Sequence, residues 1–192
     1  ASMASVSTGS YNVAMGVTAL TSVTTGSYNV ALGVQALTSN TTASNNTAVG
    51  YQAGYSNTTG TDNTFLGYNA GFLTTTGIRN TYVGRSAGPV VSSSTGSDNS
   101  VVGLGALANL TTGAYNVVMG GYEAGGYAAM NNNTTGSYNI AIGTGALSRN
   151  TTTNENTAVG YQALYPAAAA KNCAIGYQSG LSCTSGTKNT FL

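Results

Sequence analysis

The chain of 192 residues has no histidine and very few charges, five Lys or Arg and four Asp or Glu. Without histidine, a Ser-His-Asp triad, a Cys-His pair and histidine-based zinc sites are all excluded. The acids Asp62, Asp98, Glu123 and Glu155 are scattered along the chain and form no paired-carboxylate site. The net charge of +1 gives no electrostatic footprint for nucleic acid. We therefore expect no enzyme, no cofactor or metal, and no nucleic-acid partner.

Long apolar runs are missing too, so we expect no membrane insertion of this segment. The N-terminal residues lack the order of basic, apolar and small residues that marks a secretory signal. We interpret Cys173 and Cys183 as packing residues first and as a possible local disulfide second, because two cysteines define no disulfide framework. Asn-x-Ser/Thr acceptors matter only if a eukaryotic secretory pathway made the protein. They stand at Asn40, Asn45, Asn57, Asn109, Asn132, Asn133 and Asn150.

What the sequence does contain is a repeat. TGSYN occurs at 8–12, 25–29 and 135–139, and NTAVGYQA occurs at 46–53 and 156–163. The units begin at Asn12, Asn29, Asn46, Asn63, Asn80, Asn99, Asn116, Asn139, Asn156, Asn172 and Asn189. Most successive asparagines stand 17 apart, and the three exceptions stand 19, 23 and 16 apart. Both ends of the chain fall inside a unit, so we expect residues 1–192 to be a single repeat array cut from a longer chain.

Positions within a unit are numbered here from its asparagine. Position +3 is always a large aliphatic residue, and +1 and +3 suit one inward face of a short strand. Position +2 is also apolar, which predicts that the opposite face packs on a partner. Glycine at +4 predicts a corner, and alanine at +7 marks the centre of a second short strand. The pattern predicts an all-β, parallel β-solenoid with about 17-residue coils and two short strands per coil.

Position −1 holds six of the nine charges in the chain. In a stacked coil, Asp62, Arg79 and Asp98 would form an alternating ladder, and Glu155 would lie over Lys171. Tyrosines at the same position would stack in the same way. We expect these stacked pairs to be Tyr11 with Tyr28 and Tyr115 with Tyr138.

Two further columns are candidates for specific roles. The eleven asparagines that open the units, listed above, are expected to form an amide ladder along the stack. Aromatic residues at +5 are the candidate surface contacts, with a neighbouring chain favoured over a sugar ring. These residues, with the arginine that continues their row, are Tyr51, Tyr68, Arg85, Tyr161 and Tyr177. The longest unit is expected to bulge at GGYAAMNNNT, residues 125–134, because solenoid insertions form loops that often bind partners.

A single thin coil buries few apolar side chains against the entropy of ordering its residues. We therefore expect a partner surface, most economically identical chains around one axis. A stable monomer in sedimentation would contradict this.

Several phrases resemble known repeats. YNVALG at 28–33, YNIAIG at 138–143 and KNCAIG at 171–176 resemble the YadA-like head repeat of trimeric autotransporter adhesins. NTAVGYQAGYSNTTG and NTFLGYNAG, from Asn46 and Asn63, resemble repeat arrays of phage tail fibres and of surface proteins of large algal viruses. The resemblance implies a left-handed, trimeric β-roll in an attachment fibre, outside the cell on a virion or a cell-surface appendage. The units of this chain are longer than those of adhesin heads.

The function predicted from sequence is a non-enzymatic structural fibre segment of a tail-fibre or adhesin type. It would present or contribute to host attachment through identical chains and a surface glycan or protein receptor. An ice-binding solenoid is the first alternative, but Val13, Val30, Val117 and Ile140 interrupt the threonines at +1. A self-assembling extracellular filament subunit is the second.

Overall fold

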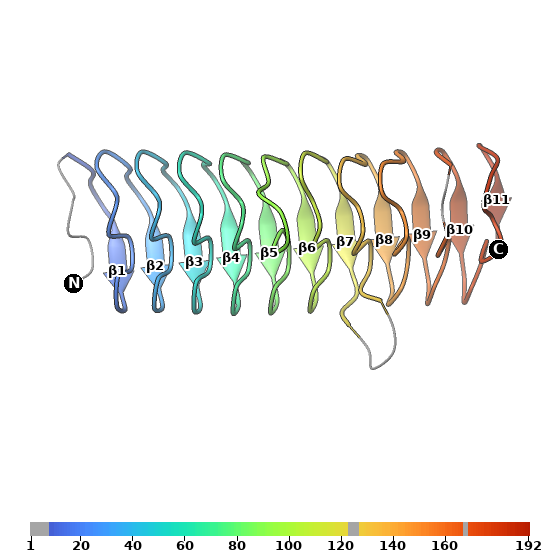
Figure 1. Cartoon of the computed structure of the whole chain (residues 1–192), viewed down its shortest axis with the longest axis horizontal. Helices are drawn as coiled ribbons and strands as arrows, with labels where there is room; N and C mark the ends of the chain where they lie inside the picture. Colours follow the sequence, from blue (N-terminus) through green and yellow to red (C-terminus); the bar gives the residue numbers. More distant parts are fainter. Residues whose placement is uncertain (1–7, 123–126, 167–168) are drawn as a thin grey trace.

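The computed structural model describes residues 8–122, 127–166 and 169–192 and shows a rod of stacked coils (Figure 1). Each coil contributes one short strand, and eleven strands form one parallel sheet in chain order. They are β1 Val13–Met15, β2 Val30–Leu32, β3 Thr47–Val49, β4 Thr64–Leu66, β5 Thr81–Val83, β6 Ser100–Val102, β7 Val117–Met119, β8 Ile140–Ile142, β9 Thr157–Val159, β10 Cys173–Ile175 and β11 Thr190–Phe191. The predicted all-β parallel solenoid is confirmed, whereas its handedness stays a prediction.

The strands pair residue for residue at the spacing of the repeat. Val30 pairs with Thr47, and Thr47 pairs with Thr64. The register survives the irregular units, since Val83 pairs with Val102 across one of them and Met119 pairs with Ile142 across the longest. Extra residues are therefore absorbed in the connections, which keeps every column continuous along the rod.

The predicted direction of the strand side chains is wrong. The central residue of each strand, at +2, is buried in β2 to β10, whereas the residues at +1 and +3 are exposed or half-buried. Ala31 thus points into the coil, and Val30 and Leu32 point outward. The physical reason is volume, because the narrow interior must also accept the alanine at +7 and the side chain at +8. The strand face that no other part of the chain covers is therefore the one with the large aliphatic residues at +3.

The second strand predicted around the alanine at +7 is also wrong, because the described residues form turns there. Positions +6 and +8 have positive φ, as at Gln35 with 60° and Leu37 with 48°. An extended strand needs negative φ at successive residues, so this alternation excludes one. The alanines themselves are buried, as close packing at +7 requires. Glycine at +4 is needed at each corner, where the φ of Gly33 is 143° and a Cβ would meet the carbonyl of Gly50.

The core runs along the whole rod as three columns. Position +2 supplies one of them, from Ala31 to Ala174, and positions +7 and +8 supply the other two. In the middle of the rod, position +2 holds Phe65 and then Tyr82, and position +8 holds glycine. A Cβ on Gly54 or Gly71 would strike the Phe65 ring. A large side chain in one column is thus matched by glycine in the other.

Candidate functional site

The eleven asparagines lie in one column and connect successive coils. From Asn29 to Asn189, each backbone N–H donates to the side-chain Oδ1 of the asparagine one coil earlier, at 2.9 to 3.1 Å. The side-chain amide also donates to a backbone carbonyl near the end of its own unit, as from Asn46 Nδ2 to Gly60 O at 2.9 Å. All but the two terminal asparagines are buried. This amide ladder satisfies backbone groups inside the rod and is closed to solvent except at its two terminal asparagines.

The column at −1 forms the stacked pairs expected from sequence. Tyr11 stacks on Tyr28 with ring centroids 5.0 Å apart. An Arg79 Nε to Asp98 Oδ1 distance of 2.6 Å defines an ion pair, and a longer one at 3.9 Å joins Lys171 to Glu155. Stacking also joins Tyr115 and Tyr138, at 4.9 Å.

One rung of the expected charge ladder differs. Among the described residues Asp62 forms no ion pair with Arg79 and accepts a hydrogen bond from Asn45 Nδ2 at 3.0 Å. Arg79 uses both its Nε and its Nη2 on Asp98. The hydrogen bonds to Asp98 and the negative charge of that carboxylate raise the pKa of Arg79 above its ordinary value, and the charge of Asp62 adds to the effect.

The outward side chains of the strands form a long uncharged strip, defined here as the outer strand face and made of the residues at +1 and +3. It holds twenty-two residues, none of them charged. Its exposed large members are Val13, Met15, Leu66, Val102, Val117, Met119, Ile140, Ile175 and Leu192. Threonine or serine fills much of the +1 column between them, from Thr47 to Ser100. An exposed apolar strip of this length is characteristic of a surface that another molecule covers.

The aromatic residues at +5 lie in short stacks. Tyr51 stacks on Tyr68 at 5.2 Å with an interplanar angle of 12°, and the guanidinium of Arg85 lies 5.5 Å from the Tyr68 ring centroid. Tyr161 stacks on Tyr177 in the same way, at 5.4 Å and 11°. Ring faces that cover one another leave edges and hydroxyl groups as the accessible parts. This geometry favours packing against a chain over stacking on sugar rings.

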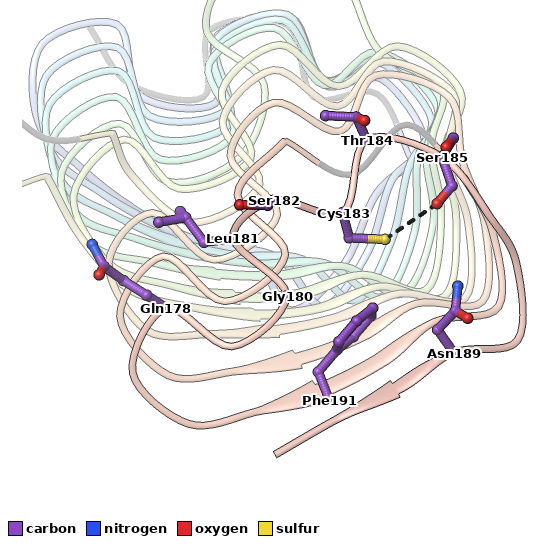
Figure 2. A pocket seen from close by; sticks show the side chains of 9 residues that line it. All are labelled: Gln178, Gly180, Leu181, Ser182, Cys183, Thr184, Ser185, Asn189 and Phe191. Carbon is purple, nitrogen blue, oxygen red and sulfur yellow. Dashed lines mark hydrogen bonds between the residues drawn. The ribbon is translucent and has the colours of Figure 1, made fainter.

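A cavity of about 540 Å³ lies at the last coil (Figure 2). The Sγ of Cys183 is directed toward the carbonyl oxygen of Ser185, 3.6 Å away, and Cys183 and Phe191 both pack against the hydrophobic core. The remaining lining of the cavity is Gln178, Gly180, Leu181, Ser182, Thr184, Ser185 and Asn189. The cavity is the end of the solenoid interior, and these lining residues offer no acid, base or charged group.

The cysteines and the Asn-x-Ser/Thr acceptors are now placed. Cys173 and Cys183 are both free, with Cys173 on the outer strand face and Cys183 beside the core. Four of the acceptors are fully buried, namely Asn40, Asn57, Asn133 and Asn150. A glycan on any of these four would be incompatible with the folded coil.

The sequence reasoning missed a cluster that brings together two irregular units. Tyr127, from the longest unit, lies against Tyr165, with ring centroids 5.7 Å apart and planes at 53°. Arg149, from the coil between them, lies 5.1 Å from the Tyr165 ring centroid. Residues 127–134 of the expected bulge are described and 125 and 126 are not; Figure 1 shows the chain leaving the row of coils after β7. The unusual lengths of these two units were the available signal.

The described residues contain no group of three or more His, Cys, Asp or Glu that could hold a metal ion. Within the same ranges, no helix could cross a membrane.

No family model, curated protein or solved structure matches this chain. Its fold and repeat define it as a β-solenoid repeat protein.

Proposed function

We propose that the chain is a structural segment of an extracellular fibre, on a virion or a cell-surface appendage, which packs against identical chains and contributes to attachment. The observation that carries this proposal is the outer strand face. It runs through every coil, it contains no charge, and its large aliphatic residues are exposed or half-buried. A scaffold that works alone in water would place charged residues there, as antiparallel sheets with one wet face do.

The size and period of this face favour a second copy of the chain as its occupant. Ten intervals of roughly 4.8 Å give a length of about 50 Å, and the outer strand face together with the flanking column at −1 is about 13 Å wide. A strip of about 650 Å² per chain gives about 1,300 Å² for a pair, within the range of stable interfaces. A copy of the chain presents side chains at the same interval. The protruding side chains of one copy can therefore pack between those of the other over the whole length.

We propose three copies around one axis, as in the adhesins that the repeats resemble. In a closed assembly of this kind the rods lie parallel, and the columns at −1 and +5 flank the shared face. Tyr51, Tyr68, Arg85, Tyr161 and Tyr177 would then contact a neighbouring chain or a receptor through ring edges and hydroxyl groups. Repetition along the rod makes such weak contacts effective through avidity.

Sedimentation of the purified chain tests this function. We expect a trimer, and we expect Val102→Lys, which places a charge in the centre of the outer strand face, to give monomers or to precipitate. Val91→Lys is the matched control, because Val91 is an exposed valine, at 63% against 41% for Val102, that lies off this face. A monodisperse wild-type monomer would refute the proposal. Open-ended polymers would instead favour the filament subunit.

Ice binding is a second candidate because the structure turns position +1 outward. Thr47, Thr64 and Thr81 stand opposite one another in consecutive paired strands. Regular hydroxyl and methyl groups on a flat face can order water. A monomer with thermal hysteresis that is abolished by Thr64→Lys would establish this function, which needs the same face that a trimer would bury.

A further inference from the structure

The cluster of Tyr127, Arg149 and Tyr165 joins one arginine to two tyrosines that come from irregular units. Two of the three units that depart from the common length meet there, one supplying Tyr127 and the other Tyr165. A backbone hydrogen bond from Arg149 N to Tyr165 O, at 3.1 Å, holds Arg149 and Tyr165 next to each other. Insertions in solenoids commonly carry binding, which makes this cluster the first place to look for it.

The charge of Arg149 is not neutralised by any described residue. Arg79 and Lys171 both have carboxylate partners. Arg149 is exposed, and its guanidinium is held over an aromatic ring instead. The phenol of Tyr165, and then that of Tyr127, raise the pKa of Arg149 above its ordinary value. A guanidinium that is held over a ring, with no carboxylate partner among the described residues, can direct its remaining N–H donors to a carboxylate of a ligand.

The two tyrosines of the cluster are tilted against each other rather than stacked. The two rings are tilted by 53°, against 12° for Tyr51 and Tyr68, so they do not stack face to face. Tyr127 is 40% exposed. An uncovered aromatic face accepts the C–H face of a sugar ring. Asn132, whose backbone N–H donates to Ser148 in the coil of Arg149, adds a half-exposed amide with no hydrogen bond to a described residue.

From this geometry we infer that Tyr127, Arg149 and Tyr165 form a binding site for a carboxylate-bearing saccharide. The guanidinium of Arg149 pairs with the sugar carboxylate, and Tyr127 lies against the ring. This site specifies the ligand class for the attachment role and to that extent rests on the proposed function. A neutral saccharide would lose the ion pair, and a simple inorganic anion would lose the ring contact.

Binding of the full chain to sialyllactose and to galacturonate oligomers tests the inference, with lactose and inorganic sulfate as comparison ligands. We expect one acidic saccharide to bind at least about tenfold more tightly than lactose and sulfate, and Arg149→Gln to remove this preference. Tyr127→Ala should weaken the acidic saccharide and leave sulfate unchanged. Arg85→Gln is the matched control, since Arg85 is also a basic residue over a tyrosine, Tyr68.

The inference is overturned if neither acidic saccharide exceeds lactose, if sulfate binds equally well, or if Arg85→Gln and Arg149→Gln have the same effect. Sedimentation of the same samples separates this outcome from failure of the proposed function. If the chain is a trimer but shows no selective binding, only the proposed site is refuted. A monomer that binds the acidic saccharide selectively removes the proposed assembly and keeps the site.

Discussion

The middle of the rod and its flanking parts fill the same interior in opposite ways. In the two aromatic coils, which begin at Asn63 and Asn80, position +2 is Phe65 or Tyr82. In the alanine coils, which begin at Asn29, Asn139 and Asn156, position +2 is alanine and position +8 is leucine. The backbone register is the same in both regions. One coil therefore tolerates two distributions of volume, provided that the total is conserved.

The difference teaches why glycine appears at +8 only in part of the chain. Gly54 and Gly71 flank the Phe65 ring, and a Cβ on Gly88 would meet Tyr82. Leucine occupies the same position elsewhere with similar φ, 48° at Leu37 against 60° at Gly54. Conformation alone thus does not require glycine there, and the aromatic ring does.

The largest effect should come from emptying an aromatic coil. Phe65→Ala leaves a void that Gly54 and Gly71 cannot fill, so we expect a loss of about 3–5 kcal/mol in the free energy of unfolding. Denaturant unfolding measures it, with Phe65→Leu as the milder control. A cost below about 1.5 kcal/mol, which is the cost of a volume-conserving swap, would mean that the coil collapses around the void.

The asparagine ladder should not distinguish the two regions. Asn63→Ala leaves the N–H of Asn80 and the carbonyl of Gly77 unpaired, and Asn139→Ala removes the same two kinds of hydrogen bond in an alanine coil. We expect each change to cost about 2–4 kcal/mol, because each leaves a buried backbone N–H without its partner and removes a second hydrogen bond, although Thr153 O keeps Asn150 Nδ2 as a donor. Unfolding in denaturant should give similar values for both. A clearly smaller loss in one region would show that the ladder is local in its effect.

Converting an aromatic coil toward an alanine coil should be possible by a paired change. Gly54→Leu alone overpacks against Phe65, with an expected cost of about 1–3 kcal/mol. Combined with Phe65→Ala, the leucine enters the void, so the double variant should be more stable than the sum of the two single losses predicts. A double-mutant cycle measures this coupling. Additive losses would contradict the compensation between the two columns.

The sequence predicts the periodic features of this fold well, because each is a property of a single column. The asparagine spacing indicates the register, and the alternation of Glu155 and Lys171 with the paired tyrosines indicates the stacking. Which strand face points inward is a different kind of question. Both Ala31 and Leu32 are apolar, so hydrophobicity alone leaves the direction open, and the decision depends on the volume that the rest of the coil contributes.

That volume was visible only as a correlation between columns, glycine at +8 wherever phenylalanine stands at +2 in the same or the next coil. The second strand was predicted from small residues, but leucine and glutamine with positive φ are rare enough that residue preferences do not indicate them. The Tyr127 and Arg149 cluster depends on two departures from the period, and no repeat pattern specifies where such departures meet in space.

The smallest effect should be confined to alkaline pH. Burial raises the pKa of Tyr82 well above its ordinary value, and its hydroxyl has no hydrogen-bond partner of normal geometry. Because the folded pKa is the higher one, the contribution of Tyr82 to stability is fully present below about pH 10 and is lost as the pH rises toward the folded pKa. Tyr82→Phe should therefore be neutral or stabilising by about 1 kcal/mol at pH 7 and should gain further on the wild type above pH 10. Unfolding measured from pH 8 to 11 tests this, and a difference between the two proteins that does not change with pH would show that the phenol of Tyr82 is accessible to solvent in the folded rod.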